Sequence, residues 1–147
     1  INTTKFEYLP TDLFREFDTH LVFTGVTRNS KKILKSVTGN LEKVKPLLKI
    51  TDQAYKSIKE KEHYKVLRQL SKGWNQKKKT SSMISENHHI QDMDNILSTC
   101  ESVVSHKLCG AGNGGFFLTF SEKDTLNIPY DSVKIKVVSE GVKGESI

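Results

Sequence analysis

The sequence predicts an α+β domain in which helices cover an antiparallel sheet. Strand-like segments lie near both ends of the chain, and helical patterns fill the middle. The length of 147 residues suits one domain with its own core, and 35% hydrophobic with 27% charged residues is ordinary for a globular protein. We expect this domain to span residues 1–140 and residues 141–147 to form a frayed tail.

Two strands are predicted before the helices begin. Residues 4–9 partly alternate and end at Pro10, which indicates an opening strand. Residues 12–18 suit a helical turn. Residues 21–23 form an apolar run that is typical of a buried strand.

Three helices are then predicted in succession. Asn29 or Ser30 can cap the first, and Gly39 with Asn40 ends it. Pro46 fits the first turn of the second helix, and the third begins near Glu62. Their apolar residues recur at helical spacing and predict core faces: Ile33, Leu34 and Val37; Leu47, Ile50, Ala54 and Ile58; Leu67, Leu70 and Trp74.

The second half begins with a polar stretch over residues 77–87 and then returns to helical spacing. A fourth helical stripe comprises Ile90, Met93, Leu97, Cys100 and Val104. Residues 116–120 are short and aromatic-rich, which predicts a strand after a glycine-rich segment. A connector over residues 124–131 leads to a half-buried strand over residues 133–137.

The glycine-rich segment before residue 116 carries the strongest functional signal. Four glycines fall within residues 110–115. Glycine readily adopts positive φ, and successive amides in such a turn can converge on an anion, although a plain hairpin also fits. The dinucleotide motif is excluded, because it must open a helix whereas a strand follows here. The Walker A motif is excluded, because Phe116 and Phe117 stand where it requires Lys and then Ser or Thr. A protein-kinase glycine loop is excluded because too little chain remains for the catalytic loop.

This segment resembles the third conserved motif of the GHMP small-molecule kinases, which include galactokinase and mevalonate kinase. The family pattern is Lys-Leu/Val-x-Gly-Ala-Gly-x-Gly-Gly before a hydrophobic strand, and residues 107–115 match it at every glycine. The resemblance implies a ferredoxin-like C-terminal kinase domain. It also implies a loop that faces the nucleotide and substrate phosphates, formed by Gly110, Ala111, Gly112, Asn113, Gly114 and Gly115. The place of Gly112 predicts a backbone conformation or a phosphate approach that a Cβ atom would obstruct.

Two further segments resemble the sugar-kinase members of this superfamily. Residues 23–30 are similar to Tyr/Phe-Thr-Gly-x-x-Arg-x-Ser/Ala, and residues 74–81 to Trp-x-x-Lys-Lys/Arg-x-Leu-Ser. Ile84 and Ser85 continue the second segment, which therefore spans residues 74–85. The combination is most like the heptose-phosphate kinase branch, although Thr80 replaces the usual leucine and His106 a usually small residue. The resemblance implies substrate-binding roles for Thr24, Gly25, Arg28, Lys77 and Lys78. From the residues alone, Arg28 fits a phosphate contact or a surface ion pair equally, and Lys77 and Lys78 also fit a solvated helix end.

The main phosphate loop of this superfamily, Pro-x-x-x-Gly-Leu-Gly-Ser-Ser-Ala, does not occur in the sequence. We therefore expect the N-terminal ATP-binding domain to be absent from this chain and to be its principal partner. ATP and Mg²⁺ would bind mainly to that domain, and this chain alone would be inactive, with no catalytic residue. No metal site is expected, because His88 and His89 point to different helix faces and favour a surface pair. The substrate would be a sugar or sugar phosphate.

The remaining composition narrows the alternatives. A non-catalytic small-molecule-binding or regulatory module with the same fold stays open, because one fold hosts many functions. The net charge of +6 admits a polyanion-binding domain, but the lysines are scattered, so no nucleic-acid partner is expected. Cys100 and Cys109 are too few for a disulfide framework, and no membrane span or leader is evident. These features favour the cytoplasm.

Overall fold

The structure is a computed structural model that describes residues 4–27, 30–138, 140, 141, 144 and 146. Its centre is a four-stranded antiparallel sheet in the order β2-β3-β1-β4. The strands are β1 (Phe17–Phe23), β2 (Ser105–Leu108), β3 (Phe116–Glu122) and β4 (Val133–Ile135). β1 and β3 are central, as in a ferredoxin-like sheet, and an irregular connection replaces a second helical crossover between β3 and β4. The predicted α+β fold class is confirmed.

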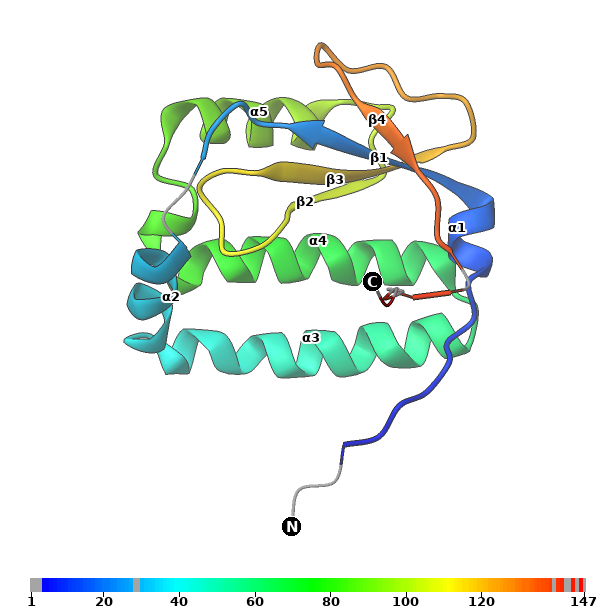
Figure 1. Cartoon of the computed structure of the whole chain (residues 1–147), viewed down its shortest axis with the longest axis horizontal. Helices are drawn as coiled ribbons and strands as arrows, with labels where there is room; N and C mark the ends of the chain where they lie inside the picture. The colour runs from blue at the N-terminus through cyan, green and yellow to red at the C-terminus, as the bar shows by residue number, and fades with distance from the viewer. Residues whose placement is uncertain (1–3, 28–29, 139, 142–143, 145, 147) are drawn as a thin grey trace.

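The helices pack along the β2 edge of this sheet and against both of its faces. They are α1 (Asp12–Glu16), α2 (Ser30–Thr38), α3 (Leu41–Lys59), α4 (His63–Thr80) and α5 (His88–Thr99), with the short 3₁₀ turn η1 (Ser82–Ile84) after α4. Figure 1 shows α3 and α4 side by side, with α4 next to β2. α5 meets α4 through Asp94, which contacts Trp74 and Lys78 of α4. Among the described residues, no helix is both long enough and apolar enough to cross a bilayer.

Two buried clusters hold these layers together. The larger cluster joins β1, β2 and β3 to α2, α4, η1 and α5, and the smaller one joins α1, β1 and β3 to α4. Their buried members are Val22, Ile33, Trp74, Ile84, Ile90, Met93, Leu97, Leu108 and Phe117 in the first, and Leu13, Phe17, Val66, Leu67 and Phe120 in the second. The predicted core positions of Trp74 and of the Ile90, Met93 and Leu97 stripe are confirmed. Leu34 was predicted as core and is 55% exposed, because α2 buries only Ile33.

The predicted opening strand is wrong. Residues 4–10 have no regular structure, and the side chains of Phe6 and Tyr8 are 95% and 100% exposed. β4 already pairs with β1, so this segment finds no strand edge there. Instead Glu7 receives a hydrogen bond from Tyr55 of α3. The predicted helical turn over residues 12–18 is present as α1, but α1 ends at Glu16. The sheet begins at the next residue, Phe17.

The predicted helix start at Pro46 is also wrong, since α3 begins at Leu41 and contains Pro46. Proline removes one backbone donor and crowds the carbonyl four residues earlier, so its place within the helix has a cost. The long contact between α3 and α4 offsets that cost. The first turn also carries an ion pair of 2.8 Å between Lys45 Nζ and Glu42 Oε1.

Three boundaries in the second half differ from the prediction. α4 continues to Thr80, so the stretch predicted as polar begins within a helix. α5 ends at Thr99, and Cys100 is extended; the amide of Val104 donates instead to the Phe120 carbonyl at 2.8 Å. β4 stops at Ile135 with Val133 66% exposed, so the predicted half-buried strand to residue 137 is shorter and more exposed. Much of the predicted frayed tail lies outside the described residues.

Candidate functional site

The glycine-rich segment forms the connection between β2 and β3. The Cys109 amide donates to the Phe116 carbonyl at 2.9 Å and closes the connection as a hairpin. Figure 1 shows this loop, in yellow, at the end of the sheet near the last turn of α4. Of the two arrangements that the sequence allowed, strand–loop–strand is the one observed.

Backbone conformation and close packing both require glycine here. Positive φ angles occur at Gly110 (75°), Gly112 (108°) and Gly115 (89°), and also at Asn113 (52°). A Cβ atom on Gly112 would lie 2.9 Å from the Ile84 carbonyl oxygen, and one on Gly114 would lie 2.6 Å from the Val26 carbonyl oxygen. The obstruction that we expected at Gly112 is therefore present, and protein backbone supplies it.

The turn after β1 fixes one side of the loop. The Thr24 amide and hydroxyl both donate to the Gly115 carbonyl, at 2.9 and 2.8 Å. The Gly115 amide returns a bond to the Val26 carbonyl at 2.9 Å. Thr24 is only 1% exposed, so its hydroxyl serves the loop. Gly25 beside it is exposed with φ 74°, and Arg28 lies outside the described residues.

The segment before α5 fixes the other side. The Asn113 amide donates to the Ile84 carbonyl at 2.5 Å, and the Asn113 side-chain oxygen accepts from the Asn87 amide at 2.9 Å. Asn87 in turn caps α5, because its side chain accepts from the amides of His89 and Ile90. The loop is thus tied to the first turn of a core helix.

The exposed end of the loop has free donors beside a cation. Lys77, in the last turn of α4, donates from Nζ to the Gly110 carbonyl. Among the described residues, the amides of Gly110 and Ala111 have no acceptor. Gly110 is exposed and Ala111 half-buried, whereas Gly112 and Gly114 are buried. Two amides and one ammonium group at one corner make an arrangement that can receive an anion.

Lys78 has a different role from its neighbour. Its ammonium lies 2.6 Å from Oδ2 of Asp94, which is 6% exposed. Oδ1 of Asp94 accepts from Trp74 Nε1 at 2.7 Å and lies 2.7 Å from His106 Nε2. Burial alone would raise the pKa of Asp94, but the hydrogen bonds from His106, Lys78 and Trp74 outweigh it and lower the pKa to about 2.

This polar cluster was not predicted from the sequence. Its signal is a carboxylate inside an apolar stripe, because Asp94 falls one turn after Ile90 and before Leu97. A charge on a buried helix face needs partners, and the cluster joins α4, α5 and β2 to supply them. His106, which departs from the branch pattern, is one of those partners.

The structure brings together the three segments that carry the resemblance. Thr24 and Val26 contact Gly115, Lys77 contacts Gly110, and Ile84 contacts Asn113. Lys78 faces Asp94. The pair His88 and His89 is exposed, and the described residues contain no group of three His, Cys, Asp or Glu side chains placed to hold a metal ion.

Comparisons with known proteins support the fold. No protein-family model and no curated protein matches the sequence. Among solved structures, 22 chains match, including the mevalonate kinase of L. major in complex with R-mevalonate, with a TM-score of 0.59 and 17% sequence identity. The match covers 74% of this chain and 34% of that kinase. At this identity the likeness shows that the chain shares its fold with part of that kinase, and it does not support the sugar-kinase branch over others. The chain spans about a third of its neighbour's length.

Proposed function

We propose that this chain is the C-terminal, substrate-side domain of an ATP-dependent GHMP-type kinase. The observation that carries the proposal is the meeting of residues 23–27, 74–85 and 107–116 at one corner of a GHMP kinase fold. Segments distant in the sequence, each similar to a motif of that superfamily, contact one another through specific hydrogen bonds. A plain hairpin would need none of these partners.

Within that kinase, the loop would face the phosphates and hold them by charge and by oriented amides. Phosphoryl transfer depends mostly on positioning and on neutralising charge. Gly110 and Ala111 would supply the amide donors, and Lys77 would supply positive charge while holding the Gly110 carbonyl away from them. Gly112 to Gly115 would shape the loop from within. Arg28 remains a proposed substrate contact. At Gly25, the position of an added Cβ is open space with respect to the described residues.

ATP and Mg²⁺ would be bound chiefly by an N-terminal domain, for which this chain is the partner. The described residues offer amides and a lysine for phosphate oxygens, and their carboxylates form no metal cluster. The substrate class we propose is a sugar or sugar phosphate, on the similarity of residues 23–30 and 74–81 to the sugar kinases. The compartment we propose is the cytoplasm.

The first test uses the full open reading frame that contains this sequence. With ATP and Mg²⁺, the whole protein should phosphorylate at least one member of a panel of hexoses, heptose phosphates and mevalonate, whereas residues 1–147 alone should turn over none. Turnover of mevalonate alone would reject the sugar branch and keep the kinase. Failure of every substrate in a folded, ATP-binding protein would favour the non-catalytic module, and turnover by residues 1–147 alone would refute the division of labour between domains.

A second test examines the loop directly. Titration of the ¹⁵N-labelled chain with inorganic phosphate should shift the amide resonances of Gly110 and Ala111. Lys77→Gln should weaken this binding about three- to tenfold, because a close opposite charge is lost. Lys79→Gln is the matched control, since Lys79 is exposed on the same last turn of α4. Equal losses in the two variants, or shifts spread over the surface lysines, would contradict a specific site at the loop.

A further inference from the structure

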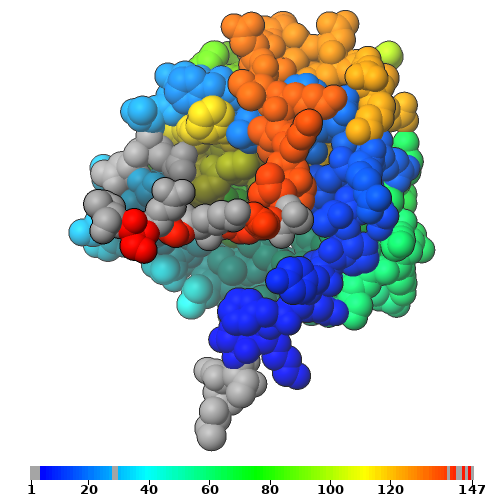
Figure 2. All heavy atoms as spheres, turned by 45° about the vertical axis from the view of Figure 1, so that its right-hand side comes forward, coloured from blue at the N-terminus to red at the C-terminus, as the bar shows by residue number. Residues whose placement is uncertain are grey.

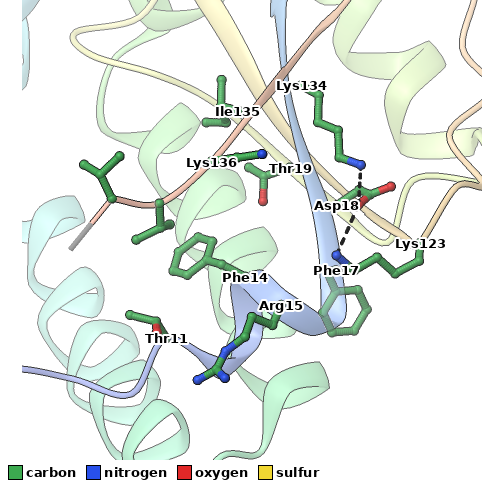
Figure 3. A pocket seen from close by; sticks show the side chains of 12 residues that line it. Thr11, Phe14, Arg15, Phe17, Asp18, Thr19, Lys123, Lys134, Ile135 and Lys136 are labelled. Carbon is green, nitrogen blue, oxygen red and sulfur yellow. Dashed lines mark ion pairs between the residues drawn. The ribbon is translucent and has the colours of Figure 1, made fainter.

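A second concave region lies at the opposite end of β1 from the glycine loop. It has a volume of about 510 Å³ and is enclosed by α1, the first residues of β1 and the segment from β4 to residue 138. Figure 2 shows the orange segment of β4 running down one face beside the blue region of α1 and β1, and Figure 3 shows the side chains that line the cavity. This volume lies within the usual range of small-molecule sites, about 300–1,000 Å³.

The cavity is separate from the loop. Thr19 of β1 lines it, whereas Thr24, just after the same strand, holds Gly115. Five residues of extended strand span roughly 17 Å at about 3.4 Å each. A ligand in this cavity would therefore not occupy the phosphate site.

One wall of the cavity is apolar. Phe14 of α1 and Ile135 of β4 contribute to it, and Val137 and Val138 extend it beyond the strand. Val137 and Val138 are 50% and 73% exposed, so this wall presents apolar surface to solvent. Removing such surface from water is favourable, and a ligand with an apolar body would do so.

Cationic side chains outnumber carboxylates in the rest of the lining. Arg15, Lys123, Lys134 and Lys136 line the cavity, and its single carboxylate belongs to Asp18. Asp18 is 3% exposed and is held by the Asp124 amide at 2.8 Å and by Lys134 Nζ at 3.1 Å.

These cations differ in their ion-pair partners. Lys123 also reaches Asp18, at 3.6 Å, and Arg15 pairs with Asp12 at 3.3 Å. Lys136 forms no ion pair with a carboxylate of the described residues. One available ammonium group thus stands beside the apolar wall, and the surrounding charge is positive.

We propose that this cavity binds a small soluble anion with an apolar body, such as an alkyl or aryl phosphate or carboxylate. The anionic head would pair with Lys136, and the apolar body would cover Phe14, Ile135 and Val137. Binding requires both the anionic head and the apolar body of the ligand. Lys136 lies at a solvent-exposed rim, where an ion pair alone contributes little to affinity, and the apolar wall offers no charge to hold the head. The proposal is independent of the kinase assignment.

Calorimetric titration of the folded chain with octyl phosphate tests the proposal. Binding should be saturable with one site and should weaken roughly fourfold for each methylene removed from the alkyl chain. It should weaken as salt is raised, since the head is held by exposed charges. Octan-1-ol and inorganic phosphate should each bind at least tenfold more weakly at this cavity. Octanoate in place of octyl phosphate distinguishes a phosphate head from a carboxylate head.

Two pairs of variants locate the site. Lys136→Gln should weaken octyl phosphate at least fivefold, whereas Lys49→Gln, an exposed lysine on α3, should not. Val137→Asp should abolish binding by removing apolar surface and repelling the head, whereas Val133→Asp, exposed on β4 outside the cavity, should leave it unchanged. All four positions are exposed, so the fold should survive, as circular dichroism will verify. Equal effects within either pair, or equal affinity for octan-1-ol, would overturn the proposal.

Discussion

Gly112→Ala should destabilise the folded chain by about 2–4 kcal/mol. An L-residue in the left-handed region costs roughly 1–2 kcal/mol, and overpacking adds about 1–3 kcal/mol. Both costs apply, because Gly112 has φ 108° and its added Cβ would lie 2.8 Å from Ile84 Cγ2 and 2.9 Å from the Ile84 carbonyl oxygen. Moving the Ile84 backbone aside would be costly, because its carbonyl accepts a hydrogen bond from the Asn113 amide. Urea unfolding monitored by Trp74 fluorescence measures the change.

Two other glycines separate these contributions. Gly25 has φ 74°, and no atom of the other described residues beyond its chain neighbours lies within 4 Å of an added Cβ, so Gly25→Ala should show the conformational cost alone, about 1 kcal/mol. Gly73 lies inside α4, and its added Cβ would meet Ile50 Cγ2 at an ordinary 3.7 Å. Gly73→Ala should therefore stabilise by about 0.5–1 kcal/mol. A Gly112→Ala protein no less stable than Gly25→Ala would show that the loop is free to move away from Ile84.

The glycine loop shows which features of the site the sequence predicts and which it does not. The spacing of glycines and the following aromatic strand predict a turn, because glycine at positive φ is a local property of the chain. The partners of that turn are not local: Val26 and Ile84 lie at least 26 residues away from it and carry no signal as backbone acceptors. The resemblance pointed to those segments, and the structure supplies the contacts.

The fold shows a similar division. Apolar stripes at helical spacing locate α4 and α5 well, since burial of one face determines both pattern and structure. The prediction of an opening strand was wrong, because alternation over residues 4–9 does not indicate whether a strand edge is available for pairing. The helix start predicted at Pro46 was wrong, because the packing of α3 on α4 outweighs the local preference of proline for the first turn of a helix. Asp94 was missed because a buried carboxylate is recognised only with its partners.

Asp94→Asn should cost about 2–4 kcal/mol of folding stability at pH 7. The amide has no charge to pair with the Lys78 ammonium, and one of its two sides is an NH₂ donor instead of an acceptor. Breaking one partner of a buried pair is more costly than losing a surface pair. The two acceptors now serve Lys78 on one oxygen and Trp74 with His106 on the other, so the neutral amide can satisfy only one side. Equilibrium unfolding in urea gives the difference.

The pH dependence of that difference identifies the charge as its cause. The Asp94 carboxyl has its pKa lowered to about 2 in the folded protein, against an ordinary 3.8. Its ionised form therefore contributes stability that is fully present above pH 3.8 and is lost as the pH falls through about 2. That contribution is about 2 kcal/mol, so wild type and Asp94→Asn should converge between pH 4 and pH 2. Asp12→Asn is the control, because Asp12 also faces two cations, Arg15 and Lys61, but at the surface. Solvent screens such pairs, so the unfolding midpoint of Asp12→Asn should differ from wild type far less than that of Asp94→Asn. A gap between wild type and Asp94→Asn that stays constant down to pH 2 would mean that shape and packing, rather than the buried carboxylate charge, make Asp94 necessary.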